Sequence, residues 1–592
     1  MTYQAPVDDI MRALKTAANL EGRLEEGLYG DLDADTLAAV IEEAGKFGAE
    51  VLAPLNRVGD KAGSKLVDGR IVTPEGWADA YRQFVEQGWG ALPCPVAFGG
   101  QGLPEIAQMA AAEIWNSANM SFGLCPLLTQ GAIHALMIAG TDEQKATYLP
   151  KMVTGAWTGT MNLTEPHAGS DLGEIRTKAV PSGDGTYRIF GTKIFITYGD
   201  HELSENIIHL VLARLPDAPP GTKGISLFLV PKYLVNRDGS LGARNDVICA
   251  GVEHKLGIHA SPTCVMQYGD GEGAVGYLIG AENRGLNTMF FMMNQARLAV
   301  GVQGVAIAER ATQHAEAYAR ERRQGAKLGG TPGEMVAIIE HADVRRALLH
   351  MKAMTQASRM ICLATAGEID VSHLSSDPGL REAGAARGAL LTPVAKAFST
   401  DVSVEVASMG VQIHGGMGFI EETGAAQYLR DARILPIYEG TNGIQAIDLV
   451  TRKLPLGGGT VVKAYLDDLS RMVGEVAASN QPELVHVAEK LAAAVKALAH
   501  ATHWIGEQLR TNPEAALASA TPYLKLFGIA AGGAYLGRAA AAAFRAGDGD
   551  GRTVMLARYF AENVATEAPG LAETVTGGAE VVLAATAERL IG

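Results

Sequence analysis

The chain has 592 residues, of which 47% are hydrophobic and 19% are charged. This composition is typical of a globular protein and excludes a collagen-like or intrinsically disordered chain. Fifty basic against 65 acidic residues give a net charge of −15, which argues against nucleic acid or an anionic membrane as a partner. A local basic patch for a phosphate-bearing ligand is still compatible with that sum.

Cysteine usage and the N-terminus bear on the compartment. The five cysteines are scattered and form no C-x-x-C pair, so neither a zinc site nor a redox dithiol is predicted. No basic segment followed by an apolar one begins the chain, so we expect no signal peptide. The longest nearly apolar stretch, Leu526–Gly537, is about a dozen residues, too short to span a bilayer. We therefore expect a cytoplasmic protein with no integral membrane segment.

The first 155 residues are predicted to be mostly helical. Asp35–Phe47 and Pro104–Trp115 place apolar residues at helical spacing, and a glycine-rich loop, Phe98–Pro104, lies before the second of them.

Residues 156–284 change to a strand pattern. Apolar and polar residues alternate around Gly191, and short runs rich in Leu or β-branched residues follow at Asn206–Leu215, Gly224–Pro231 and Thr263–Tyr268. Such runs, separated by turn signals, predict an antiparallel barrel or sandwich.

Long helical patterns return over residues 285–452, at Leu298–Ala319, Met335–Ala366 and Leu390–Ser408. A Pro/Gly boundary, Leu454–Gly459, then precedes residues 460–592, which are rich in alanine and again helical.

In that last segment one apolar helix face runs from Leu484 to Ile505, and the loop Gly547–Gly551 precedes a final helical hairpin. The order of helices, strands and further helices predicts a mostly α protein with a central β domain (α+β), rather than a doubly wound fold.

Three segments could carry chemistry. Met161–Asp171 offers the hydroxyls of Thr164 and Ser170 beside small residues, which suit a polar ligand, although a plain turn into the strand region explains them too. Gln412–Phe419 places adjacent glycines after a helix, where a pyrophosphate or another backbone could approach. Its His414 is either a base or a packing residue.

The third segment is Ile437–Gln445. Asn442 and Gln445 have capping-box spacing, so a helix is predicted to start near Ile444. Glu439 precedes it among the apolar residues Leu435, Ile437 and Tyr438, and burial there would raise its pKa toward a useful range for a base. The alternative is a solvated glutamate at a helix entry.

Basic residues add a weaker signal. Arg320–Arg323 and Arg345–Arg346 could bind phosphates or simply form a solvated helix face. Arg297 lies between apolar stretches and needs an anionic or polar partner if it is buried. No metalloprotease, Walker or calcium-loop motif is present, and no metal site is expected.

Together these segments resemble the flavin-dependent acyl-CoA dehydrogenases. The resemblance runs from about Phe98 to Asp448, on the motifs Met161–Asp171, Lys193–Thr197, Glu253–Gly257, Gln412–Phe419 and Tyr438–Thr441. It implies an N-terminal helical domain (1–155), a β-barrel or sandwich middle domain (156–284) and a C-terminal four-helix bundle (285–452). The segment 460–592 is similar to the added helical domain of the larger members.

The resemblance also implies site residues and FAD as cofactor. The flavin contacts it implies are Met161, Leu163, Thr164, Gly169, Ser170, Phe195, Thr197 and Thr441; Arg322, Gln412, Gly415 and Gly416 would hold the pyrophosphate and adenine of a flavin shared across a subunit interface. The local register leaves Arg323 as the alternative to Arg322. The substrate contacts it implies are Ser170, Asn294, Arg297 and Gly440.

In the reaction the resemblance implies, Glu439 removes the α-proton of an acyl-CoA while the β-hydrogen leaves as hydride to flavin N5, giving the trans-2-enoyl-CoA. The Glu439 amide would hold the thioester carbonyl. His414 and Glu165 are the alternative bases. An electron-transfer flavoprotein is the implied acceptor and a homodimer the implied assembly.

The flank Tyr3–Asp9 and the chain length are most similar to members acting on 3-(methylthio)propanoyl-CoA, with straight-chain fatty acyl-CoA as the alternative substrate. An acyl-CoA oxidase and a non-catalytic acyl-CoA-binding protein are the competing hypotheses.

Overall fold

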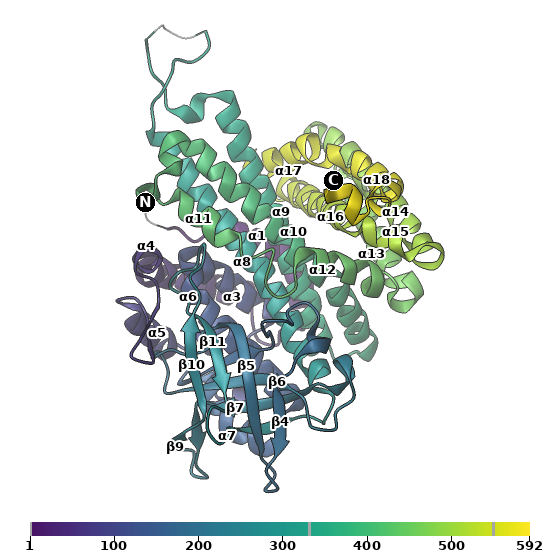
Figure 1. Ribbon diagram of the computed structural model, residues 1–592. Helices are drawn as coiled ribbons and strands as arrows, with labels where there is room; N and C mark the ends of the chain where they lie inside the picture. Colours follow the sequence, from purple (N-terminus) through teal and green to yellow (C-terminus); the bar gives the residue numbers. More distant parts are fainter. Residues whose placement is uncertain (1–2, 330–332, 548–550, 592) are drawn as a thin grey trace. The chain divides into compact units, whose positions relative to one another are not determined.

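The computed structural model describes residues 3–329, 333–547 and 551–591 (Figure 1). Its α-helices are Val7–Thr16 (α1), Leu20–Glu25 (α2), Ala34–Phe47 (α3), Ala53–Ala62 (α4), Trp77–Glu86 (α5), Glu105–Ala139 (α6), Asp142–Val153 (α7), Gly285–Glu321 (α8), Ala342–Leu374 (α9), Pro378–His414 (α10), Ala425–Ala432 (α11), Asn442–Asp448 (α12), Thr460–Ala478 (α13), Pro482–Thr511 (α14), Pro513–Ala518 (α15), Ala520–Arg545 (α16), Gly551–Asn563 (α17), Ala568–Gly577 (α18), Ala579–Leu583 (α19) and Ala587–Ile591 (α20).

The β-strands are Lys65–Val67 (β1), Arg70–Val72 (β2), Trp157–Asn162 (β3), Lys178–Pro181 (β4), Tyr187–Thr197 (β5), Asn206–Ala213 (β6), Ser226–Pro231 (β7), Tyr233–Val235 (β8), Leu241–Arg244 (β9), Val247–Val252 (β10), Thr263–Tyr268 (β11) and Ala274–Ile279 (β12). Helices precede and follow strands β3–β12, as the patterning predicts, whereas the short hairpin of β1 and β2 lies between α4 and α5.

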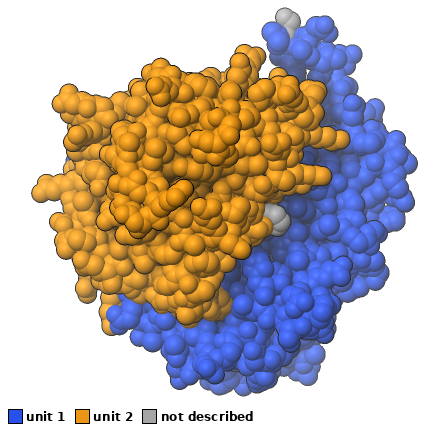
Figure 2. All heavy atoms as spheres, turned by 90° about the horizontal axis from the view of Figure 1, so that it is seen from below, with its two compact units in different colours: residues 1–45, 105–117, 297–592 blue, residues 46–104, 118–296 orange. Residues whose placement is uncertain are grey.

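Two compact units make up the chain (Figure 2): unit 1 comprises residues 1–45, 105–117 and 297–592, and unit 2 comprises residues 46–104 and 118–296. Helix α6 passes from one unit to the other next to Asn119, whose φ of −161° and ψ of 92° interrupt the helix. The two units cut across the expected 1–155 domain. The four domain boundaries predicted from the sequence stay a prediction.

Unit 2 is built on an eight-stranded sheet in the order β10-β11-β5-β12-β7-β6-β3, with β4 paired to β5. The pairs are antiparallel except β3 and β6, which run parallel, so the purely antiparallel expectation is wrong for that pair. Every residue of β6 and β7 is buried, because both faces of these strands are covered. Leu210 and Leu212 pack in one apolar cluster with residues of α6 and α7, while Val211 and Ala213 pack in a second cluster with β5, β10 and β11.

Unit 1 contains the long helices α9 and α10, which lie side by side, and most of α8 (Figure 1). Glycines let α8 approach α10: a Cβ on Gly301 would lie 2.7 Å from the Ala395 carbonyl oxygen, and one on Gly304 2.6 Å from that of Ser399. Between α6, α8 and α9 the buried Arg359 bonds to Glu113 at 2.6 Å and Glu309 at 2.7 Å. A buried cation with two carboxylates around it is electrostatically matched.

The segment after Gly459 forms helices that pack on the bundle, as expected from its apolar face. Leu484, Leu491 and Ile505 of α14 are buried. Helix α16 contacts α9 and α10, and its Gly528 lies against the Phe398 ring.

One helix predicted from the sequence starts in the wrong place. The pattern Met335–Ala366 predicts helix throughout, but α9 begins only at Ala342. Residues before it pair their backbone with residues 322–325 instead, through Gln324 N–H to the Val336 carbonyl at 3.0 Å and Ile338 N–H to the Arg322 carbonyl at 2.8 Å. Of the expected Gly547–Gly551 loop, residues 548–550 lie outside the described residues.

Two helices, α6 and α16, are long and apolar enough to cross a membrane by length and composition alone. Their most apolar windows are 72% and 83% buried within the protein, which is what helices of a folded core show.

Candidate active site

Glu439 lies in the loop between α11 and α12, and its backbone is strained. Its φ is +57°, in the left-handed region, and Gly440 follows at φ +88°. A non-glycine residue held there costs about 1–3 kcal/mol and persists only where its surroundings enforce it, often at functional sites. The base expected from the sequence therefore has an unusual backbone conformation.

Three long side chains of unit 1 hold this loop by its carbonyl oxygens. Arg297 Nε donates to the Glu439 oxygen at 3.3 Å, and Gln445 Nε2 donates to the Glu439 and Gly440 oxygens at 3.4 and 3.3 Å. Lys396 Nζ donates to the Gly440 oxygen at 2.9 Å. The loop is thus fixed from α8, α10 and α12.

The same surroundings set the charge state of the carboxyl. Burial raises the pKa of Glu439 to about 7, against the opposing effect of the nearby charges of Arg297 and Lys396. A carboxyl with such a pKa can accept a proton efficiently near neutral pH. Leu435 is buried as the sequence suggests, but Ile437 is 49% exposed, so that expected apolar neighbour points to solvent.

The helix after the loop starts earlier than predicted. Helix α12 begins at Asn442 rather than near Ile444, and Thr441 is its N-cap, accepting from the Ile444 N–H at 3.3 Å. The capping box expected from Asn442 is wrong because that side chain bonds to Asp401 at 2.7 Å instead. Thr441, an expected flavin contact, keeps its hydroxyl proton available for another acceptor.

The expected flavin-ring contacts of unit 2 come from the ends of β3 and β5. The Ile194 N–H donates to the Thr164 carbonyl at 2.9 Å, which joins the two segments. Leu163 is buried, whereas Met161 and Thr197 are half-buried. The two motifs, which are separated in sequence and whose strands do not pair in the sheet, are thus joined by a backbone hydrogen bond.

Phe195 is turned out of the sheet by a β-bulge. The β5–β11 register shifts between Cys264 and Met266, and Phe195 adopts φ +61° with 58% of its surface exposed. Bulges next to functional sites redirect single side chains in this way. An aromatic ring is thereby presented outside the sheet, as the expected flavin cover requires.

The loop after Thr164 is closed by two backbone bonds between Glu165 and Ala168, at 2.9 and 3.0 Å. Gly169 and Ser170 follow on the exposed side of that loop. They are the small residue and hydroxyl that the sequence assigns to the flavin and the substrate.

Glu165 is engaged by protein groups and is a poor base. Its carboxylate accepts from Lys193 Nζ at 2.9 Å, from the Thr177 hydroxyl and amide at 2.6 and 3.0 Å, and from the Arg176 amide at 2.7 Å. Burial alone would raise its pKa, but Lys193 and these hydrogen bonds bring the net pKa below its usual value. Lys193 also donates to the Leu163 carbonyl at 2.8 Å and so fixes the start of the flavin motif.

His414 is a packing residue. It is buried, its ring stacks on Tyr318 with centroids 4.4 Å apart, and its Nδ1 lies 2.7 Å from the Gly410 carbonyl. Burial lowers its pKa, which makes it a weak proton acceptor.

The end of α10 offers an open backbone. Gly415 terminates the helix at φ +60°, and neither Gly415 nor Gly416 has any atom within 4 Å of the position a Cβ would take. Gln412 is exposed in the last turn of α10. This uncovered glycine pair fits the close approach of a pyrophosphate, so the residues present suit FAD.

The two candidate phosphate arginines differ in what they bind. Both are exposed, but Arg323 donates to the Met335 carbonyl at 2.7 Å, whereas the Arg322 side chain makes no hydrogen bond within the described part of the chain. This difference favours Arg322 as the phosphate ligand.

The expected substrate residues Asn294 and Arg297 lie in different surroundings. Asn294 is exposed on α8. Arg297 is 6% exposed and lies 3.8 Å from Asp448 in addition to the Glu439 carbonyl. Its guanidinium therefore contacts the loop that carries Glu439, and its role as a substrate contact stays a prediction.

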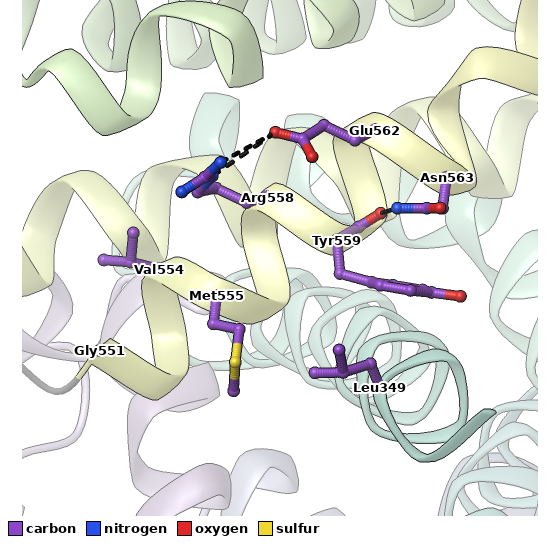
Figure 3. A pocket seen from close by; sticks show the side chains of 8 residues that line it. All are labelled: Leu349, Gly551, Val554, Met555, Arg558, Tyr559, Glu562 and Asn563. Carbon is purple, nitrogen blue, oxygen red and sulfur yellow. Dashed lines mark hydrogen bonds and ion pairs between the residues drawn. The ribbon is translucent and has the colours of Figure 1, made fainter. Parts of the chain in front are cut away.

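A separate shallow cavity of about 280 Å³ lies between α9 and α17 (Figure 3). It is lined by Leu349, Gly551, Val554, Met555, Arg558, Tyr559, Glu562 and Asn563. Arg558 pairs with Glu562 at 3.5 Å across its rim. None of the expected site residues lines it.

Sequence reasoning missed Lys396, and it named Lys193 and Gln445 only in a motif and in a capping box, without the contacts that they make here. A signal existed for Lys396, which is the single charge in the apolar helical run Leu390–Phe398. Among the described residues, no group of three or more His, Cys, Asp or Glu side chains is placed to hold a metal ion.

Four family models match successive parts of the chain. Models of the acyl-CoA dehydrogenase N-terminal, middle and C-terminal domains match residues 34–156, 160–270 and 283–454, and a model described as acetyl-CoA dehydrogenase C-terminal like matches residues 468–586.

The relatives are similar over most of their length. The 3-methylmercaptopropionyl-CoA dehydrogenase of Ruegeria pomeroyi is 49% identical, over 99% of this chain and 100% of that one. A butyryl-CoA dehydrogenase of Syntrophomonas wolfei is 37% identical, over 79% of this chain and 78% of that one. The solved structure of an acyl-CoA dehydrogenase from Bacillus anthracis complexed with FAD shares the fold, with a TM-score of 0.73, 21% identity, and coverage of 93% of this chain and 89% of that one. The chain belongs to the acyl-CoA dehydrogenase family and is an FAD-dependent oxidoreductase.

Proposed function

We propose that Glu439 is the base that removes the α-proton of an acyl-CoA thioester, so that the product is the trans-2-enoyl-CoA. One observation carries this proposal: the Glu439 carboxyl, on a left-handed loop held from three helices, has a pKa of about 7. The rival carboxyl Glu165 is already bound by Lys193 and three further donors.

The loop also supports a way to stabilise the enolate-like charge that forms when the α-proton leaves. Within the described part of unit 1, the Glu439 amide donates no hydrogen bond. It is therefore free to donate to the thioester carbonyl, and an N–H aimed at a developing oxyanion is worth about 10²–10³ in rate. FAD, when bound, supplies the acceptor for the β-hydride.

The residues that would hold FAD fall into two groups. Met161, Leu163, Thr164, Gly169, Ser170, Phe195, Thr197 and Thr441 would bind its ring side, and Arg322, Gln412, Gly415 and Gly416 its pyrophosphate and adenine. Ser170, Asn294, Arg297 and Gly440 would contact the substrate. The bulge at Phe195 and the open glycine pair support these roles.

The substrate we propose is 3-(methylthio)propanoyl-CoA, because the relative named for that substrate is 49% identical over the whole chain. A straight-chain acyl-CoA such as butyryl-CoA is the second candidate, since a relative at 37% identity is named for it.

The test is anaerobic reduction of the bound flavin, followed by loss of its absorbance, with a panel of acyl-CoAs that includes both candidates. Glu439→Gln should bind substrate but reduce flavin at least about 10²–10⁴-fold more slowly. Glu422→Gln removes an exposed carboxylate and is the matched control. Near-normal reduction by Glu439→Gln with FAD bound would refute the base assignment, and fastest reduction by butyryl-CoA would refute the thioether preference.

We further propose an electron-transfer flavoprotein as electron acceptor, a homodimer as the assembly and the cytoplasm as the location. The exposed apolar side chains Met417, Phe419 and Ile420 after α10 support a covered surface there. Light scattering that gives the mass of one or four subunits would contradict the dimer, and rapid peroxide formation in air would favour an oxidase.

A further inference from the structure

Lys396 is a buried cation whose bonds end on the loop of the proposed base. It lies on α10, is 0% exposed, and donates to the Gly440 carbonyl at 2.9 Å and to Asn442 Oδ1 at 2.8 Å. Asn442 in turn donates to Asp401 at 2.7 Å and to the Ala397 carbonyl at 3.1 Å. One ammonium thus joins α10 to both sides of Thr441.

Burying an ammonium is costly unless it is paired, because the charge loses its hydration. Elsewhere in unit 1 the buried Arg359 bonds to two carboxylates. Lys396, by contrast, donates its hydrogen bonds to neutral oxygens of the base loop. Burial lowers its pKa to about 7, although Glu439 and Asp401 favour its charged form. A purely structural anchor at this place would be better served by a neutral donor.

We propose that Lys396 is a positioning residue for the base. Its hydrogen bond to the Gly440 carbonyl keeps Glu439 in the left-handed backbone that presents its amide and carboxyl, and its positive charge stabilises the ionised carboxylate. This inference rests on the proposed role of Glu439. It adds a residue that acts through the base rather than on the substrate.

The charges around Glu439 in unit 1 decide the sign of the expected effect. Arg297 faces it from α8 and Lys396 from α10, while Asp401 of α10 acts on Lys396 and Asp448 of α12 pairs with Arg297. Both cations lower the pKa of Glu439. Removing the charge of Lys396 must therefore raise that pKa and move the acidic limb of the rate profile to higher pH.

Two variants separate the hydrogen bond from the charge. Lys396→Met removes both, whereas Lys396→Gln keeps an N–H donor without the charge. Flavin reduction by substrate is followed anaerobically from pH 5.5 to 9.5, together with FAD content and melting temperature. Lys496→Met, at an exposed lysine of α14, is the matched control.

In both Lys396 variants the acidic limb should move up by about one pH unit or more. The rate above that limb should fall about 10–100-fold in Lys396→Met, because a base displaced by about 1 Å loses up to that much. It should be largely restored in Lys396→Gln. If Lys396→Met does not fold, the inference is tested by the position of the acidic limb in the pH–rate profile of Lys396→Gln.

If the acidic limb of the pH–rate profile is unchanged in a folded, FAD-containing Lys396 variant, the inference is overturned and Lys396 is a structural anchor only. Failure of the proposed function gives a different result, because Glu439→Gln in the wild-type background would then still reduce flavin. Combining Lys396→Met with Glu439→Gln should add little to the loss from Glu439→Gln alone if the lysine acts through the base.

Discussion

Replacing Gly440 with alanine tests whether the backbone of the base loop matters to its chemistry. Gly440 has φ +88°, a conformation that an L side chain rarely adopts, and a Cβ there would lie 2.8 Å from Gln445 Nε2. That contact is with the end of a flexible side chain, so Gln445 can move. It would then give up its bonds to the Glu439 and Gly440 carbonyls.

The magnitude follows from these two effects. The left-handed backbone costs an alanine about 1–2 kcal/mol, and loss of the weak Gln445 bonds adds about 0.5–1.5 kcal/mol. In so large a protein this shifts the melting temperature by only about 1–3 °C. The rate is a sharper readout, since a shift of the base by about 1 Å can cost 10²-fold.

Gly443→Ala is the matched control three residues away. Gly443 lies inside α12, and a Cβ there would meet only Thr441 Oγ1 at an ordinary 3.8 Å. Alanine is favoured over glycine in a helix by about 1 kcal/mol, so this variant should be at least as stable as wild type. Both are compared by anaerobic flavin reduction at equal FAD content. If Gly440→Ala reduces flavin as fast as Gly443→Ala, the left-handed loop is not needed for positioning the base.

Three further predictions concern pH, charge and packing. Flavin reduction by the wild type should rise with pH around a midpoint near 7, because only ionised Glu439 accepts a proton and its pKa is about 7; a midpoint near the ordinary value of 4.5, in stopped-flow measurements, would contradict this. Lys193→Met should destabilise the protein in urea titrations by about 3–5 kcal/mol, since it leaves the Glu165 carboxylate buried without its cation; wild-type stability would refute a paired role. Gly528→Ala should destabilise by about 1–3 kcal/mol, because its Cβ would lie 2.2 Å from the Phe398 ring, and an unchanged melting temperature would show that α16 can move away from α10.

The sequence predicts the elements whose signal is local. The predictions for two elements agree with the structure to within a residue: Asp35–Phe47 with α3 and Thr263–Tyr268 with β11. These elements are predictable because the spacing of apolar residues within a single element indicates which of its faces is buried. The parallel pairing of β3 and β6 is not predictable in that way, since it joins residues about 50 positions apart. The start of α9 fails for a related reason: residues 336–338 pair with residues 322–325, and that tertiary bonding overrides a helical pattern.

The residues of the candidate site also differ in whether they can be predicted from local sequence. The motifs around Thr164 and Glu439 can be found in the sequence because their residue types and order are distinctive. The residues that hold these motifs in place cannot be found in this way. Lys193 binds the Leu163 carbonyl from 30 residues away, and Lys396 binds the Gly440 carbonyl from 44 residues away. A single lysine in an apolar run indicates that the lysine has a buried partner, but it does not indicate which residue that partner is.

The left-handed backbone of Glu439 shows why these supporting hydrogen bonds are needed. Glycine at 439 would adopt φ +57° without strain, but it has no carboxyl to accept a proton. An Asp or Asn would tolerate that conformation better than Glu, but each has a side chain shorter by one methylene. A glutamate can be kept there only if the strain of about 1–3 kcal/mol is offset by neighbours. Hydrogen bonds onto the two loop carbonyls from Arg297, Gln445 and Lys396 are of that size together, at about 0.5–1.5 kcal/mol each and more from the charged donors. The backbone of the proposed base is therefore a property of three helices, and a change at any of the three donors should alter its reactivity before it alters the fold.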